Sequence, residues 1–224
     1  ENWEKLEQYD NNAPKTMNAH LHVLEAYTLL YQCWKDNGLK KRLEFCVDLF
    51  MNRIYDPSRK HFNLFFDNEW NSLVEMDSYG HDVETGWLLC EAARTLENQD
   101  LIEQTNQLAL DVTEACLAEG MSDKGYMIYE KKGDRKTKHA SWWGQIETVI
   151  ACVNAWQISG SDVYLQSVDT VWTFVKDHMV DKEYGEWYSD CFDGEPKKEA
   201  PKVSMWRCPY HTVRLGVEMY NRLK

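Results

Sequence analysis

The chain has 224 residues, of which 43% are hydrophobic and 13% aromatic, so it is long and apolar enough to build one sizeable core. A formal net charge of −12 argues against a nucleic-acid partner and against binding to an anionic membrane surface, because both need a basic face. There is no run of apolar residues long enough to suggest a transmembrane helix. The seven cysteines are odd in number and form no Cys-x-x-Cys motif, which favours reduced thiols and a cytoplasmic location.

Apolar segments alternate with amphipathic segments along the chain, at lengths typical of helices. The expected helices cover residues 19–34, 39–54, 81–96, 99–118, 142–158 and 161–179, with a last one from Pro209 onward. Gly38, Gly120 and Gly160 are expected to end helices, and Ser141 and Ser161 to cap them. Three stretches between the helices alternate polar and apolar residues around turn residues, which predicts hairpin-like excursions.

Helices that are apolar nearly all round need neighbours on both sides, and two concentric layers of helices provide them. The pattern therefore predicts an all-α fold, an (α/α)6-type toroid, present here as a partial barrel of about seven helices. We expect residues 1–224 to form a single domain, the C-terminal portion of such a barrel. Its open edge would be covered by a missing N-terminal half or by another chain. Four cysteines in apolar helical stretches are expected in the core: Cys33, Cys46, Cys90 and Cys152.

A histidine or a tryptophan pair recurs at the start of each apolar helix, at steps of about 60 residues. These positions are His22, His81, Trp142–Trp143 and His211, with the partners Glu25, Glu84, Glu147 and Arg214 one turn later. One helical turn places both members on the same face. The repeat therefore predicts a ring of helices that points a polar site inward. The remaining histidines are expected on another helix face or at the surface: His20, His61, His139 and His178.

Four stretches carry a resemblance to a known family: residues 18–27 (NAHLHVLEAY), 80–84 (GHDVE), 142–147 (WWGQIE) and 206–214 (WRCPYHTVR). Together and in this order they resemble the cellobiose 2-epimerases, within the N-acylglucosamine 2-epimerase superfamily. The resemblance covers essentially the whole chain and corresponds to roughly the last half to three-fifths of a family member. It implies an α/α barrel, a sugar substrate, no cofactor and no metal ion.

The resemblance also implies a chemistry and a set of site residues. Inversion at C2 of an aldose needs two acid–base groups, and histidine, with an unperturbed pKa of about 6.5, suits both roles. His81 and His211 are similar to the family's acid–base pair. Glu84 is expected to orient His81 or to hold a hydroxyl group. The substrate-binding residues implied are Asn18, His22, Glu84, Trp143, Glu147 and Trp206.

Other functions stay open at this point. An aldose–ketose isomerase, or an epimerase of mannose or N-acylglucosamine, would use the same two histidines and the same enediolate. A non-catalytic partial barrel that binds sugar or requires a partner is an alternative of another class. A glycosidase is a weaker alternative, because it needs two opposed carboxylates where this repeat places histidines. The resemblance also disfavours a three-histidine zinc site.

Overall fold

Polar residues just before the apolar runs begin four of the helices. In the computed structural model, which describes residues 13–224, the side chains of Thr16, Asp36, Asn98 and Ser141 each accept a hydrogen bond from the backbone N–H three residues later. The helices are α1 (Met17–Cys33), α2 (Asn37–Leu49), α3 (Tyr79–Leu96), α4 (Gln99–Gly120), α5 (Trp142–Ser159), α6 (Val163–Phe174) and α7 (Tyr210–Arg222). Short π-helical turns extend α2 and α6: η1 (Phe50–Ile54) and η2 (Val175–Met179).

The predicted helix ends are confirmed at α4 and α5 and wrong at two other places. Gly120 is the last residue of α4, and Gly160 follows α5 with a left-handed φ of 71°. Gly38 ends no helix but lies inside the first turn of α2, because Asp36 caps that helix two residues earlier. Ser161 does not cap α6 either, since its N–H donates to Ser159 Oγ and no side chain caps that helix.

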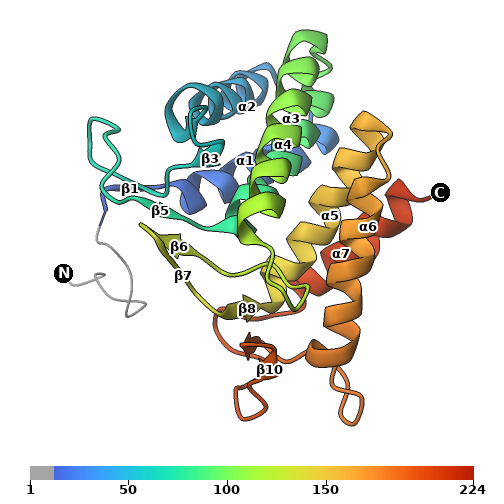
Figure 1. Ribbon diagram of the computed structural model, residues 1–224. Coiled ribbons are helices and arrows are strands. Elements are labelled where there is room, and N and C mark those ends of the chain that lie inside the picture. The colour runs from blue at the N-terminus through green and yellow to red at the C-terminus, as the bar shows by residue number, and fades with distance from the viewer. Residues whose placement is uncertain (1–12) are drawn as a thin grey trace.

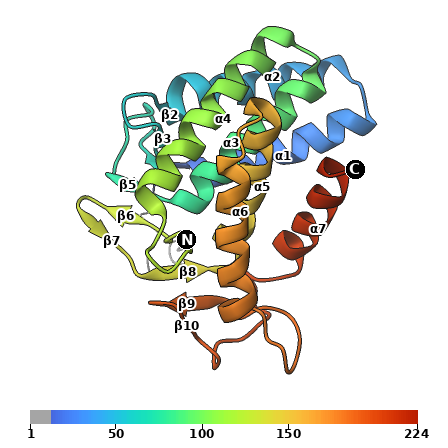
Figure 2. The same ribbon diagram turned by 45° about the vertical axis from the view of Figure 1, so that its right-hand side comes forward.

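The helices form two layers of a partial α/α barrel, as predicted (Figure 1). The inner helices α1, α3, α5 and α7 pack side by side in chain order. Outer helix α2 covers α1 and α3, α4 covers α3 and α5, and α6 covers α5. Within residues 13–224, no outer helix follows α7, and Figure 2 shows it standing at one side of the molecule.

Short strands build the hairpin-like excursions that the sequence predicts. Two sheets have two strands each, β1 (Lys15–Thr16) with β4 (Phe65–Phe66) and β2 (Tyr55–Asp56) with β3 (His61–Phe62). Two sheets have three strands each: β6 (Lys131–Lys132) lies between β5 (Met76–Asp77) and β7 (Arg135–Lys136), and β9 (Asp190–Phe192) lies between β8 (His139–Ser141) and β10 (Glu195–Pro196). All pairs are antiparallel, with registers such as Met76 opposite Lys132 and Ala140 opposite Cys191. The β5–β6 pair connects the first hairpin-like segment to the second, and the β8–β9 pair connects the second to the third. These segments lie on the side of the molecule away from the C-terminus (Figure 1).

The expectation of a surface position for His61 is wrong. The His61 residue is 1% exposed, because Asp82 at the start of α3 accepts a hydrogen bond from its Nδ1 at 2.8 Å. The other carboxylate oxygen of Asp82 accepts from the backbone N–H of Phe62 at 2.9 Å. Asp82 thus fixes the first excursion to α3, whereas His139 and His178 keep part of their surface accessible.

Burial differs between the middle and the edges of the helical arc. Helices α3 and α5 are buried over most of their length, while α1 and α7 keep large apolar side chains exposed. The core prediction holds for Cys46, Cys90 and Cys152 but is wrong for Cys33, which lies at the exposed end of α1. None of the helices in the described part of the chain is long and apolar enough to cross a membrane.

Candidate active site

The first turns of α3, α5 and α7 bring two histidines and a tryptophan together. The ring centroid of Trp143 lies 4.6 Å from that of His81 and 5.8 Å from that of His211. This proximity requires a glycine before His81, since a Cβ added at Gly80 would lie 2.6 Å from Cζ3 of Trp143. The glycine of the sequence stretch GHDVE therefore allows α3 and α5 to approach closely enough for one shared site.

Ser78, not Glu84, orients His81. Ser78 precedes α3 without capping it, and its Oγ instead lies 2.8 Å from Nδ1 of His81. Glu84 makes no hydrogen bond to His81 among the described residues, so the predicted orienting role is wrong. Burial lowers the pKa of His81 below its usual 6.5, and the positive charges of His22 and His211 act in the same direction. The His81 imidazole is therefore neutral at pH 7 and able to accept a proton.

A buried carboxylate fixes the orientation of His211. Oε1 of Glu147 accepts a hydrogen bond from Nδ1 of His211 at 2.7 Å, and its Oε2 accepts one from Trp87 Nε1 at 2.9 Å. Glu147 is fully buried, so its position is set by these partners. The arrangement leaves Nε2 of His211 available to a substrate, with Nδ1 carrying a proton.

Arg214 joins the charged residues of all four inner helices. Its Nη1 donates to Glu84 at 2.6 Å and to Glu147 at 2.9 Å, and its Nη2 donates to Glu25. The guanidinium also lies over the rings of Tyr210 and Trp87, with Cζ 4.2 and 5.3 Å from their centroids. Burial opposes the charge, but the three carboxylates outweigh burial and raise the pKa of Arg214.

Glu84 is a buried carboxyl group beside Glu147 and Arg214. Burial raises its pKa to about 7, the neighbouring charge of Glu147 adds to the rise, and Arg214 opposes it. Together with His211, these two glutamates have ligand atoms within 4.8 Å of one another, a spacing that would suit a metal ion. The guanidinium of Arg214 already supplies the positive charge between the two carboxylates, at hydrogen-bond distance from each.

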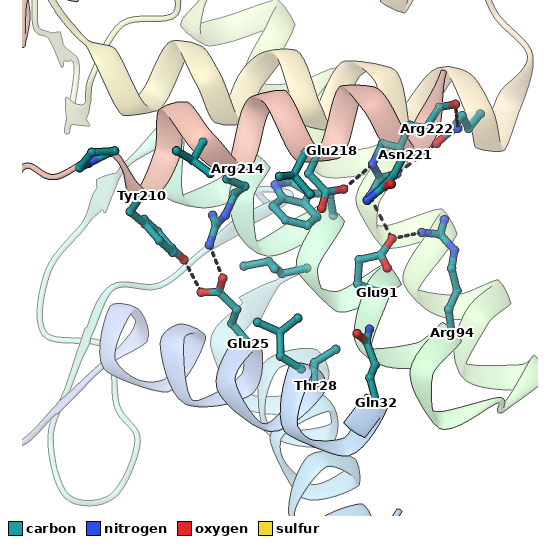
Figure 3. Close-up of a pocket in the computed structure, with 17 residues that line it drawn as sticks. Glu25, Thr28, Gln32, Glu91, Arg94, Tyr210, Arg214, Glu218, Asn221 and Arg222 are labelled. Atoms are coloured by element: carbon teal, nitrogen blue, oxygen red, sulfur yellow. Dashed lines mark hydrogen bonds and ion pairs between the residues drawn. The ribbon is translucent and has the colours of Figure 1, made fainter. Parts of the chain in front are cut away.

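Glu25 on α1 anchors the edge of the site. It accepts hydrogen bonds from Arg214 and from the Tyr210 hydroxyl, and Figure 3 shows both side chains reaching from α7 toward it. Nδ1 of His22 lies 3.3 Å from the same carboxylate. Burial disfavours the charge of Glu25, but the hydrogen bond from His22 and the attraction of Arg214 prevail and lower its pKa. In return, the hydrogen bond to Glu25 raises the pKa of His22.

Two cavities open next to these residues. The smaller, about 490 Å³, contains His22 and His211 together with Trp206 and Tyr210, so three of the predicted site residues share it. The larger, about 850 Å³, runs between α1 and α7 with α3 at its back (Figure 3), and shares Glu25 and Tyr210 with the first. Asn18 is exposed one turn before His22 and lines neither of these two cavities.

Three residues that contact the site lie outside the predicted set: Ser78, Trp87 and Tyr210. Tyr210 lies within the recognised stretch 206–214 and Ser78 lies two residues before the stretch 80–84, so their positions are a usable indication at the sequence level. Trp87 lies one turn after Glu84 and hence on the same face of α3, but its hydrogen bond to Glu147 on α5 depends on helix packing. The resulting site combines a neutral imidazole, a second imidazole held by a carboxylate, and an aromatic face between them. Such a site is suited to proton transfer on a polyhydroxylated substrate.

Comparisons with known proteins point to one family. The sequence profile of the N-acylglucosamine 2-epimerase (GlcNAc 2-epimerase) family matches residues 2–214. A cellobiose 2-epimerase of Bacteroides fragilis is 40% identical over 220 residues, covering 96% of this chain and 55% of the relative. A cellobiose 2-epimerase of Dictyoglomus turgidum is 35% identical over 97% of this chain and 56% of its own length. The chain therefore spans about half the length of these curated relatives.

Solved structures agree in fold. A cellobiose 2-epimerase from Bacillus thermoamylovorans superposes with a TM-score of 0.90 at 36% identity, over 94% of this chain and 54% of that one. A sugar epimerase from a ruminal bacterium gives a TM-score of 0.91 at 35% identity, over 95% and 56% of the two chains. The described helices thus form part of an (α/α)6-type barrel, as predicted.

Proposed function

The chain belongs to the N-acylglucosamine 2-epimerase family, and from this premise we propose that it acts as the C-terminal part of a sugar 2-epimerase. The proposed reaction inverts C2 of the reducing-end glucose in β-1,4-linked disaccharides such as cellobiose and lactose. The observation that carries the proposal is the pairing of His81 and His211 across the ring of Trp143. Sequence likeness to cellobiose 2-epimerases over nearly the whole chain supports the substrate class.

The proposed mechanism begins with ring opening, which exposes an aldehyde and makes the C2 proton acidic. One imidazole takes that proton, an enediolate forms, and the other imidazole returns a proton to the opposite face of C2 after rotation about C2–C3. His81 is assigned the role of base because its imidazole is neutral in the resting site, although the burial that keeps it neutral also lowers its basicity. Glu147 holds Nδ1 of His211, which leaves Nε2 as the ring nitrogen for proton transfer, and His211 lines the smaller cavity. Since the reaction runs both ways, each histidine acts as acid in one direction and as base in the other.

Substrate contacts are proposed for the other predicted residues. The face of Trp143 between the histidines is suited to packing on a sugar ring, and half-exposed Trp206 is suited to the second ring of a disaccharide. His22 adjoins the same cavity as His211. Glu84, Glu147 and Asn18 complete the proposed set, with the two glutamates acting through Arg214 and His211 as well as on hydroxyl groups.

A deuterium experiment tests the reaction. Incubation of the protein with cellobiose in D₂O should place deuterium at C2 and yield the glucosyl-mannose product. A ketose product without the C2 epimer would instead identify an aldose–ketose isomerase, which shares the enediolate. Absence of exchange with any aldose would contradict catalysis by this chain and favour a non-catalytic or partner-requiring partial barrel.

We further propose that the single domain is completed at its open edge by N-terminal helices or by another chain. Exposed Leu29 and Leu30 on α1 and Val213 and Val217 on α7 motivate this, because a closed ring would cover such flanks. A cytoplasmic location remains a prediction, which the seven free cysteines support.

A further inference from the structure

A second cluster of titratable side chains lies where β3, β5 and the end of α4 meet. It contains His61, Asp77 and Glu119, none of which takes part in the proposed epimerisation. One ligand atom from each of these three residues lies within 4.8 Å of the other two. We refer to these three residues as the β3–β5–α4 cluster.

His61 has an unused ring nitrogen inside this cluster. The His61 side chain is 2% exposed, and its Nε2 is buried without a hydrogen-bond partner among the described residues. The nearest charged atom is Oε1 of Glu119 at 3.8 Å. A buried ring nitrogen without a hydrogen-bond partner in the protein is costly, which calls for a physical explanation.

The surroundings of the cluster resemble the outer shell of a metal site. Asp82 accepts from Nδ1 of His61 at 2.8 Å, a carboxylate–histidine contact that orients the opposite nitrogen for a metal ion. Arg59 donates to Oδ1 of Asp77 at 2.5 Å and leaves Oδ2 facing the cluster. Glu119 lies in the last turn of α4, where the helix dipole favours a cation.

A cation already occupies the same space. Nζ of Lys131 lies 3.0 Å from Oε2 of Glu119 and 4.0 Å from Oδ2 of Asp77. The ammonium group pairs with the two carboxylates, but it makes no hydrogen bond to Nε2 of His61, which can accept one because Nδ1 is the donor nitrogen of that ring. Lys131 is 28% exposed, so its long side chain can leave toward water without unfolding the strand that carries it.

We propose that the β3–β5–α4 cluster binds a divalent transition-metal ion such as zinc, with the ammonium of Lys131 as its competitor in the metal-free protein. Nε2 of His61 and one carboxylate oxygen each from Asp77 and Glu119 supply three ligands, and water completes a tetrahedron. Nε2 of His61 and Oε1 of Glu119 are 3.8 Å apart. Two ligand atoms of a tetrahedral zinc ion are roughly 3.3 Å apart, so the observed distance is only slightly longer. Because Glu119 is 39% exposed, its side chain can close that difference.

The bound ion would be structural. It would tie the first excursion and the strand before α3 to the end of α4, three segments that are distant in the sequence. Cys116 lies near His61 and Asp82, but it does not belong to the group in which His61, Asp77 and Glu119 bring their ligand atoms together. The ligand set is therefore nitrogen and oxygen without thiolate.

Zinc affinity, measured by competition with a chromophoric chelator, tests the proposal. The protein carries Cys33→Ser and Cys208→Ser, because these two exposed thiols would bind zinc themselves. Glu119→Gln should weaken binding at least tenfold, and Lys131→Met should strengthen it about tenfold by removing the competing charge. Both substitutions fall on partly exposed side chains, so the fold should persist.

Two further readouts make the test decisive. Zinc should raise the melting temperature of the Lys131→Met variant more than that of the Glu119→Gln variant. Cobalt bound in place of zinc should give visible d–d absorption without a thiolate charge-transfer band. The proposal is overturned if zinc fails to bind, if neither substitution changes its affinity, or if His211→Ala removes the binding, which would place the ion in the active site.

Discussion

The middle helices α3 and α5 and the edge helices α1 and α7 belong to the same inner layer but have different surroundings. Helix α3 has neighbours on both sides, and its Leu89 is fully buried. Among residues 13–224, helix α1 packs closely against one inner helix, α3, and meets α7 across a cavity through Glu25, so its Leu29 is 55% exposed although it belongs to an equally apolar segment. The comparison shows that equally apolar segments differ in burial according to the neighbours that pack against them.

The two pairs of helices also differ in what attaches them. The buried residues of α7 are Arg214 and Leu215 alone, so this helix is fixed largely by charged hydrogen bonds to the middle helices. Helices α3 and α5 are instead fixed by apolar packing along their length. The site lies where the helices held by apolar packing meet the helix held by charged hydrogen bonds, with His81 on a middle helix and His211 on an edge helix.

Replacement of Arg214 tests the charged attachment and should have the largest effect on stability. Arg214→Ala leaves Glu84 and Glu147 buried without their cation, so we expect a loss of about 3–5 kcal/mol in the free energy of unfolding. Urea denaturation measures it, with Arg53→Ala on an exposed arginine as the matched control. Equal stability of the two variants would show that α7 is held by something other than this cluster.

A pair of leucine substitutions tests the difference in burial. Leu89→Ala on α3 should cost about 2–5 kcal/mol through the cavity it leaves, and Leu29→Ala on α1 should stay within about 0.5 kcal/mol. The same urea experiment compares them. A large cost for Leu29→Ala would mean that another copy of the chain covers α1 in solution, and the cost would then depend on protein concentration.

The titration of two histidines tests the smallest of the expected differences between the middle and the edge helices. Burial lowers the pKa of His81 on α3, whereas the hydrogen bond to Glu25 raises the pKa of His22 on α1. His81 therefore adds stability above pH 6.5 that is lost as the pH falls, and His22 adds stability below pH 6.5 that is lost as the pH rises through its folded pKa. Ring-proton NMR should give midpoints on opposite sides of 6.5, and midpoints in the reverse order would contradict the described environments.

Local sequence patterns predicted most of the fold and which side chains face the site, but not the contacts between those side chains. The alternation of apolar and amphipathic segments located the helices, and one-turn spacing placed Glu84, Glu147 and Arg214 on inward faces. Spacing along one helix cannot show which residues on different helices meet. The sequence pattern therefore could not predict the hydrogen bonds of Arg214 to other helices or the contact between Ser78 and His81. It could not predict the burial of His61 either, because that depends on Asp82 from another element.

The most direct test of the account is the rate of C2 deuterium incorporation into cellobiose, compared among three histidine variants. Proton transfer by the His81–His211 pair predicts that His81→Ala and His211→Ala each lose about 10²–10⁴-fold in rate while keeping their helical circular dichroism. His20→Ala should retain the rate of the unmodified protein, because Nδ1 of His20 is hydrogen-bonded to the backbone of Thr16, away from the site. Near-normal exchange in either the His81 or the His211 variant would contradict the assignment.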